Sequence, residues 1–311
     1  MDQGLGETQK PPFRARRGPI IAGIRPLSEY YSPPATQSGR GCHGGFRLLP
    51  PFRPIWYNGR EAGRVASRAS GAPLGRIAVI IPAKNEAENI SGVLSGIRAH
   101  LPEADIIVVD DNSDDATAET VLLCESATLL HCPVSVGIGG AVQLGVRYAL
   151  ERGYPLFIRM DGDGQHPPQA ARELVRNHLP GLLVQGSRDP HQFSTTSNSA
   201  RKIGSLYFRS LFRLFTGSQV TDPTSGFMCF DREMAEMFAR FYPMDFPEIE
   251  SLVLLARSGH KIVPVTVSMT PRISGVSSIG WFRAGVYMFS VSIAFFSSFV
   301  RKNPYGAAHA A

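Results

Sequence analysis

From Arg76 onward, short apolar segments alternate with longer segments that have polar ends. Residues 77–82, 105–110, 128–132 and 157–160 are predicted strands, and helices are expected between them. Strands of a parallel sheet lack the in-and-out alternation of exposed antiparallel strands, because helices cover both faces of the sheet. The pattern therefore predicts an α/β fold with a Rossmann-like, mostly parallel sheet and helices on both faces.

Three polar clusters follow predicted strands directly, at Pro82–Glu86, Asp110–Asp114 and Asp161–Gln165. In open parallel sheets, ligands bind beyond the carboxyl ends of the strands. Since all three clusters are expected at that edge, the sequence predicts one binding site there.

The third cluster contains two aspartates, Asp161 and Asp163, separated by one glycine. Residues two apart in an extended segment project to the same side, and two close carboxylates repel each other unless a cation lies between them or one is protonated. Mg²⁺ and Mn²⁺ prefer carboxylates together with phosphate oxygens, and Gln165 offers a third oxygen. The alternative is a polar turn whose aspartates cap the next helix.

Residues 1–75 differ in composition from the rest of the chain. They hold 10 prolines and 12 glycines, and 11 Lys and Arg against 4 Asp and Glu, or +7; the other 236 residues carry 21 against 22, or −1. We expect this segment to be disordered, because it cannot bury enough apolar surface to offset its ordering entropy. A transit peptide and a misassigned start site are the alternatives. The basic charge lies outside the predicted fold, so it does not indicate nucleic-acid binding.

The cysteine pattern bears on the compartment. Cys42, Cys124, Cys132 and Cys229 form no CxxC pair and match neither a zinc site nor a dense disulfide framework. We expect them to be small core residues of a protein in a reducing compartment, the cytoplasm. The polar residues after Met1 do not resemble a signal peptide.

The C-terminal segment 279–302 is predicted to form one apolar or amphipathic helix. Its uncharged run, Ala284–Val300, has 17 residues, which is the lower limit for a bilayer span. Trp281 and Tyr287 near one end and Arg301–Lys302 at the other are typical of an interfacial anchor. We therefore favour a helix at the membrane surface, or one packed on the core, over a membrane-spanning helix.

Six segments occur together, in the order Ile81–Ile90, Val108–Thr117, Asp161–Pro167, Gly186–Arg188, Asp222–Phe227 and Arg272–Ser277. This set resembles the family 2 glycosyltransferases of the GT-A fold. It is most similar to the polyprenyl-phosphate sugar transferases of the dolichol-phosphate mannosyltransferase type. The resemblance covers residues 76–280, of which 76–278 are the expected catalytic domain.

The resemblance implies a role for each matching residue. The nucleotide pocket would be lined by Pro82, Ala83, Asn85, Glu86 and Asp111. The metal, Mg²⁺ or Mn²⁺, would be held on the donor diphosphate by Asp161, Asp163 and Gln165. The acceptor phosphate would contact Arg188, Arg201 and Ser205, while Arg272 would reach the donor diphosphate from a loop. The family commonly ends this loop in Lys, where the chain has Ser278, which puts loop closure and the acceptor in question.

These roles predict an inverting, metal-dependent transfer of a sugar from a GDP- or UDP-sugar to a polyprenyl phosphate. The enzyme would be peripheral at the cytoplasmic membrane face, with a separate membrane subunit as a further candidate partner. A phosphate acceptor is already an anion and needs no general base, whereas a hydroxyl acceptor would need one, for which Asp222 and Glu250 are the candidates. The alternatives are the same donor chemistry with a saccharide or other hydroxyl acceptor, and a non-catalytic nucleotide-sugar-binding scaffold.

Overall fold

The computed structural model describes residues 55–57, 76–188, 199–218, 220–269 and 281–306. The chain divides into two units, Met1–Pro51 and Phe52–Ala311, and every described element belongs to the second. Most of the segment 1–75 and the loop that carries Arg272 therefore lie outside the described residues.

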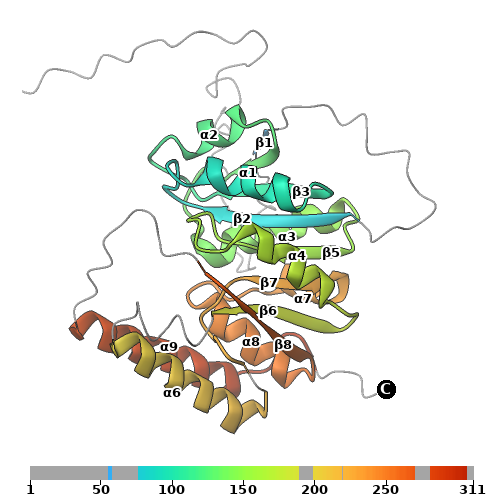
Figure 1. The fold of residues 1–311 in the computed structure, drawn as a ribbon. Helices are drawn as coiled ribbons and strands as arrows, with labels where there is room; N and C mark the ends of the chain where they lie inside the picture. Colours follow the sequence, from blue (N-terminus) through green and yellow to red (C-terminus); the bar gives the residue numbers. More distant parts are fainter. Residues whose placement is uncertain (1–54, 58–75, 189–198, 219, 270–280, 307–311) are drawn as a thin grey trace, which may run out of the picture. The chain divides into compact units, whose positions relative to one another are not determined.

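One eight-stranded sheet runs through the second unit (Figure 1), in the order β1-β4-β3-β2-β5-β7-β6-β8. The strands are Ile55–Tyr57 (β1), Ile77–Ala83 (β2), Ala104–Asp110 (β3), Ala127–His131 (β4), Leu156–Arg159 (β5), Leu182–Arg188 (β6), Met228–Asp231 (β7) and Lys261–Val267 (β8). β4, β3, β2 and β5 pair in parallel, β7 opposes both of its neighbours, and β8 is parallel to β6. Only β1 and β7 oppose the common direction among these strands, which confirms the predicted mostly parallel sheet.

β1 lies inside the segment for which the sequence predicts disorder. Its residues Ile55–Tyr57 pair antiparallel with β4 at the edge of the sheet. The prediction is therefore wrong for these three residues. Hydrogen bonding to a neighbouring strand can order a short apolar run whose flanking composition favours disorder.

Helices cover both faces of the sheet, as the apolar strands predict. One face carries α1 (Ile90–His100), α2 (Thr117–Leu123) and α4 (Pro168–Arg176). The other carries α3 (Gly137–Glu151), α7 (Arg232–Arg240) and α8 (Pro247–Arg257). Alternate residues of β2 serve the two cores, since Val79 belongs to the first and Ile80 to the second. All seven residues of β2 are buried, which explains its continuous apolar sequence.

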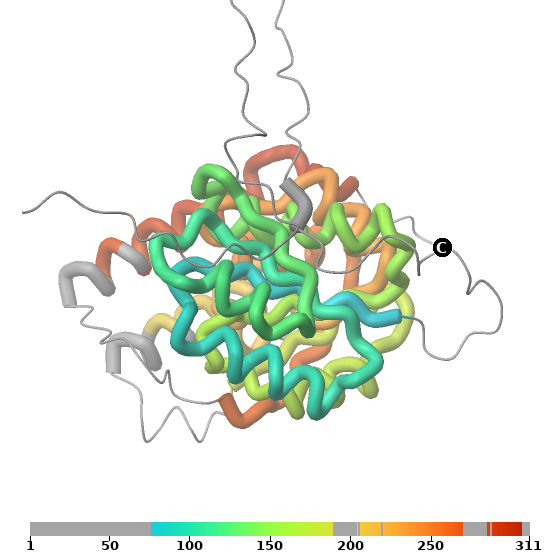
Figure 2. Tube along the Cα trace, turned by 90° about the horizontal axis from the view of Figure 1, so that it is seen from above, coloured from blue at the N-terminus to red at the C-terminus, as the bar shows by residue number. Residues whose placement is uncertain are grey.

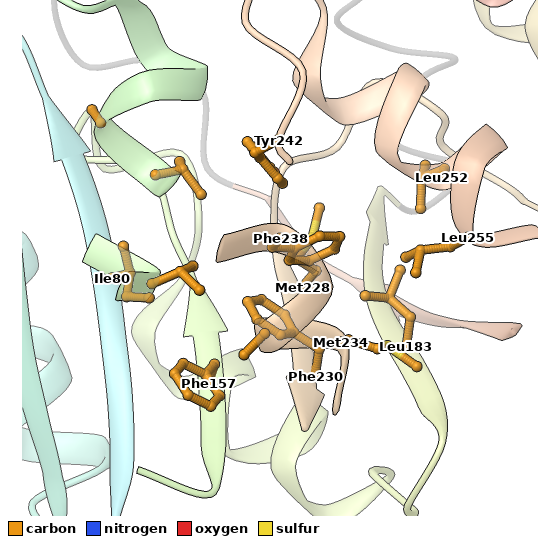
Figure 3. Close-up of a cluster of buried hydrophobic side chains, with 14 of the residues drawn as sticks. Ile80, Phe157, Leu183, Met228, Phe230, Met234, Phe238, Tyr242, Leu252 and Leu255 are labelled. Atoms are coloured by element: carbon orange, nitrogen blue, oxygen red, sulfur yellow. The ribbon is translucent and has the colours of Figure 1, made fainter. Parts of the chain in front are cut away.

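Figure 3 shows the core on the second face, where β5, β7, α7 and α8 meet. Phe157 and Phe230 stack with their ring centroids 5.5 Å apart, and Phe238 meets Phe230 edge-on at 4.9 Å. All three rings are fully buried, and each stabilises the fold by about 1.5–3 kcal/mol on leaving water. This packing holds α7 and β7 against β5, the strand that precedes the candidate metal ligands.

Two long helices, α6 (Ser199–Thr216) and α9 (Trp281–Val300), lie side by side in both views (Figures 1 and 2). Phe215 of α6 packs against Phe295 and Phe296 of α9, with ring centroids 5.9 and 5.5 Å away. α9 is the helix found within the segment 279–302. None of the described helices combines the length and the apolar character that crossing a membrane requires.

Candidate active site

Three loops meet at the carboxyl ends of the neighbouring strands β3, β2 and β5. Asn85, after β2, accepts a hydrogen bond from the Asp114 amide at 2.8 Å, and its own amide donates to Ser113 Oγ at 2.9 Å. The amide of Met160, after β5, donates to the Ile80 carbonyl at 3.0 Å. The predicted convergence of the three polar clusters on one edge of the sheet is therefore confirmed.

The residues after β2 form a closely bonded turn. Asn85 has a φ of 56°, in the left-handed region that asparagine tolerates better than most residues. The Glu86 amide donates to Thr117 Oγ1 at 2.8 Å, and Glu86 Oε2 accepts a hydrogen bond from Asn89 at 2.8 Å. Pro82 and Ala83 are buried directly before the turn. Hydrogen bonds within the protein therefore fix the conformation of the turn. The nucleotide contacts of these residues stay a prediction.

Asp111 anchors the start of α3. Its buried carboxylate accepts hydrogen bonds from Ser135 Oγ (2.8 Å), the Val136 amide (2.5 Å) and the Gly137 amide (3.1 Å). A helix N-terminus presents unpaired amides and a partial positive charge, so a carboxylate stabilises it. The structure therefore gives Asp111 a role in folding that the sequence did not suggest, while its contact with a nucleotide stays a prediction.

The predicted metal ligands lie in the loop between β5 and α4. Asp163 Oδ1 accepts a hydrogen bond from the Gln165 amide at 3.0 Å, so this aspartate closes a polar turn. It does not cap the next helix as the alternative predicts, because the N-cap of α4 is Pro167 and no side chain caps it. Asp161 Oδ1 differs, because it is buried and makes no hydrogen bond within the described part of the chain. A buried carboxylate oxygen that lacks a donor is stabilised by a nearby cation.

The donor set fits a divalent metal. Two carboxylates and the amide oxygen of Gln165 are ligands that Mg²⁺ and Mn²⁺ accept, with diphosphate oxygens and water completing the shell. Across the described residues, no group of three or more His, Cys, Asp or Glu side chains could hold a metal by itself.

His166 positions the backbone of the same loop. Its Nδ1 accepts a hydrogen bond from the Asp161 amide at 3.0 Å, and its ring stacks on Phe227 with centroids 4.9 Å apart. Burial lowers the pKa of His166, and the nearby Arg159 and Arg188 act in the same direction against Asp161 and Asp163. A neutral ring with Nδ1 as acceptor explains how the loop is held.

Arg188 and Asp222, which the sequence proposes for two separate roles, form an ion pair. Arg188 ends β6, and its Nε lies 3.2 Å from Oδ2 of the almost fully buried Asp222. Thr224 Oγ1 donates to the other carboxylate oxygen at 2.9 Å. Because the pair occupies the Asp222 carboxylate, its geometry suits orienting Arg188 better than accepting a proton from a hydroxyl.

Glu250, the second candidate base, lies in a different network. Its Oε2 is 3.2 Å from Ser298 Oγ and 3.1 Å from Arg301 Nη2, near the end of α9. Burial raises the pKa of Glu250, although Arg301 and Ser298 oppose this. These contacts connect α8 to the C-terminal segment and favour a structural role over the proposed one as a base.

Three predicted site residues cannot be placed by their side chains. Arg201 and Ser205 belong to α6, but their own side chains are not described, and Arg272 lies outside the described residues. Conversely, Arg159 contacts both Tyr242 and Glu248 and lies near the predicted metal ligand Asp161, and no role was predicted for these three residues. The signal that could have found them is a charged residue, Arg159, in an otherwise apolar strand.

Comparison with known proteins agrees with this geometry. The family model described as glycosyl transferase family 2 matches residues 78–238. The chain belongs to this family. The glycosyltransferase is 33% identical to the undecaprenyl-phosphate mannosyltransferase of Micrococcus luteus over 222 residues, which cover 66% of this chain and 87% of the relative. It is 28% identical to the polyprenol monophosphomannose synthase of Mycolicibacterium smegmatis over 246 residues, with 75% and 92% covered.

Solved structures confirm the fold as GT-A-like. A mannosyltransferase of Pyrobaculum calidifontis, in complex with GDP-Man and Mn²⁺, superimposes with a TM-score of 0.55 at 18% identity, covering 75% of this chain and 66% of that one. Glucosyl-3-phosphoglycerate synthase of Mycobacterium tuberculosis, in complex with Mn²⁺, UDP and glucosyl-3-phosphoglycerate, gives a TM-score of 0.55 at 19% identity, with 72% and 80% covered. At these identities the likeness concerns the fold.

Proposed function

We propose that this glycosyltransferase moves a sugar from a nucleotide diphosphate sugar, GDP- or UDP-linked, to the phosphate of a polyprenyl phosphate. The observation that carries the proposal is the position of Arg188. Arg188 is the last residue of β6, which runs parallel to β5. It therefore lies at the same carboxyl-terminal end of the sheet as Asp161 and Asp163, paired with the buried Asp222. A guanidinium suits a phosphate acceptor. The two relatives named for polyprenyl acceptors support the same assignment.

The reaction is a single displacement. A phosphate oxygen of the acceptor forms the new bond to the anomeric carbon as the bond from that carbon to the diphosphate oxygen breaks, so the configuration inverts. The acceptor is an anion at neutral pH, and no general base is required. Arg188, with Arg201 and Ser205 of α6, would orient the acceptor phosphate, while Asn85, Glu86 and Asp111 would border the nucleotide.

The leaving nucleoside diphosphate gains charge in the transition state. A bound Mg²⁺ or Mn²⁺ would neutralise part of this charge. Asp161, Asp163 and Gln165 would hold the metal, and Arg272 would add a positive charge from its loop. Aspartates suit this role better than neutral ligands, because their negative charge helps to hold a dication beside the diphosphate.

A membrane-facing surface would let the enzyme reach a lipid acceptor. α6 and α9 together expose large apolar side chains, which are Leu206, Leu214, Phe215, Val286, Phe289, Ile293, Phe296 and Val300. Several of them are more than half exposed, including Leu214 at 77% and Phe289 at 69%. Exposed arginines, Arg209 and Arg213, lie on α6 beside them. Apolar and basic residues on the surface of two paired helices suit contact with an anionic membrane. We therefore propose that the enzyme binds the membrane surface through α6 and α9.

The test is release of nucleotide diphosphate by the purified full chain. A thermal-shift screen of GDP, UDP and their sugars with Mn²⁺ first selects the donor, because a bound ligand raises the melting temperature. We expect product release that requires both Mn²⁺ and a polyprenyl phosphate. Release that is equally fast with a saccharide acceptor, or with the polyprenol lacking its phosphate, would contradict the proposal.

A further inference from the structure

Arg159 is the last residue of β5 and lies two residues before Asp161. Its side chain is completely buried and is the largest among the fully buried side chains of the described residues. Arg159 Nη2 lies 3.6 Å from Asp161 Oδ1, the buried oxygen that makes no hydrogen bond in the described chain. Taking an arginine out of water is costly, so its partners must offset the desolvation.

Two side chains from other elements hold the guanidinium. Nη2 donates to the carboxylate of Glu248, in the first turn of α8, and Nη1 donates to the Tyr242 hydroxyl at 3.3 Å. An arginine guanidinium stays protonated in proteins. Arg159 is therefore a buried cation that contacts Tyr242 and Glu248 and lies near Asp161.

Gly226 leaves the space that the guanidinium occupies. A Cβ atom at this position would lie 2.7 Å from both Cζ and Nη2 of Arg159. The turn that carries Asp222 thus passes over Arg159, and a Cβ at position 226 would require the guanidinium to move. The position of the guanidinium depends on β5, α8 and this turn together.

The charged groups near the predicted metal ligands leave a net negative charge. Asp161, Asp163 and Glu248 supply three negative charges in their ionised forms, and Arg159 supplies one positive charge. The negative charge that remains favours a cation. Without Arg159, the partly buried Glu248 would lose the cation that it contacts, and Asp161 would lose the neighbour of its buried oxygen.

We propose that Arg159 is the positioning residue of the metal site: held by Glu248 and Tyr242, it orients the Asp161 carboxylate and offsets the repulsion between the two aspartates. Arg159 is neither a ligand nor in contact with substrate. The inference rests on the proposed metal-dependent function and specifies how its site is prepared before the metal binds.

Binding of Mn²⁺ to the full chain, followed by electron paramagnetic resonance with and without GDP or UDP, tests the inference without turnover. Arg159→Gln should lower the Mn²⁺ affinity about 10- to 100-fold, as is usual when an outer partner of a metal ligand is lost. Arg159→Lys should restore part of the affinity, because a lysine ammonium can still pair with Glu248 and lie beside Asp161. Equal affinity in the wild type and Arg159→Gln overturns the proposal.

Arg257→Gln is the matched control. Arg257 lies at the other end of α8 and donates to the carbonyls of Ser298 and Arg301, so its loss should lower stability and leave Mn²⁺ affinity unchanged. A loss of affinity as large as that of Arg159→Gln would mean general destabilisation and would overturn the proposal.

Two further variants separate the remaining outcomes. If Arg159→Gln does not fold, Glu248→Gln, which releases the guanidinium from its anchor, should lower the affinity at least severalfold; unchanged affinity overturns the proposal. Asp163→Ala separates the two levels of inference. A wild type that binds Mn²⁺ no better than Asp163→Ala refutes the metal-dependent function itself, whereas an effect of Asp163→Ala without one of Arg159→Gln refutes only the role of Arg159.

Discussion

Arg188 Nε and Asp222 Oδ2 lie 3.2 Å apart and join the end of β6 to the turn before β7. Asp222 is 1% exposed, while the Arg188 side chain is 27% exposed. The carboxylate therefore depends on the arginine for compensation, while part of the arginine side chain remains exposed to solvent. This one contact connects the stability of the turn with the proposed binding of the acceptor phosphate.

Arg188→Met should therefore both destabilise the protein and lower its turnover. Leaving the buried Asp222 carboxylate without its charged partner should cost about 1–3 kcal/mol in the free energy of unfolding. Adding Asp222→Asn should recover most of this stability, because the charge is gone, but not the turnover with polyprenyl phosphate. Urea unfolding and nucleotide release of the two single variants, the double variant and the wild type measure both effects. Recovered turnover in the double variant would contradict the role of Arg188.

Asp163→Ala should abolish turnover that depends on Mn²⁺ or Mg²⁺ while the protein stays folded. The variant loses the hydrogen bond from the Gln165 amide, which should cost only about 0.5–1.5 kcal/mol of stability. Treating the wild type with EDTA should stop turnover, and adding the metal back should restore it. Nucleotide release and thermal melting measure the two effects, and full activity in EDTA would refute the metal site.

The double variant Leu214→Ser/Phe289→Ser should bind vesicles that contain anionic lipid less tightly, by about tenfold or more, because each side chain contributes on the order of 1.5 kcal/mol on leaving water. Its melting temperature should not fall, since both side chains are exposed in the fold. Leu123→Ser on α2 is the control, because Leu123 is 80% exposed and lies away from the proposed surface. Cosedimentation with vesicles measures binding, and an equal loss in the control would contradict the assignment.

Gly139→Ala should destabilise the fold by about 3 kcal/mol. A Cβ at this position in α3 would lie 2.1 Å from the Pro243 carbonyl oxygen, so backbone would have to move. Gly92→Ala in α1 is the matched variant, because a Cβ there meets nothing within 4 Å. It should stabilise the protein by about 0.5–1 kcal/mol through helix propensity. Urea unfolding measures the stability of both variants. Equal effects would show that the contact of α3 with the loop at Pro243 is not tight.

Glu250→Gln should change the pH dependence of stability. Because burial raises the pKa of Glu250 above its ordinary value of 4.5, the folded state favours the protonated carboxyl. Its contribution to stability is complete below the unfolded pKa and is lost as the pH rises through the folded pKa. The melting temperature of the variant relative to the wild type should therefore increase as the pH rises above about 4.5. A difference that is constant or decreases with pH would show that the ion pair with Arg301 dominates over burial.

Local patterns in the sequence were sufficient for the class of fold and for the edge that carries the site. β2 is apolar because it is buried on both faces, and that burial is visible in its composition. The polar clusters directly follow strands, so their place at the carboxyl ends followed from the direction of the chain. β1 was missed because pairing with β4 orders it. The sequence of these three residues does not indicate that they pair with a strand 70 or more positions away.

The sequence by itself determined that this protein is an α/β glycosyltransferase with Asp161 and Asp163 at a strand end, because burial, turn chemistry and motif order are properties of neighbouring residues. Only the tertiary structure decided how the charged side chains pair. Arg159 pairs with Glu248, which is 89 positions away in the chain. Arg188, at the end of β6, pairs with Asp222 in the turn before β7. These partners meet because β5, β6, α8 and the turn that carries Asp222 pack together. The spacing of the residues along the chain does not indicate that packing.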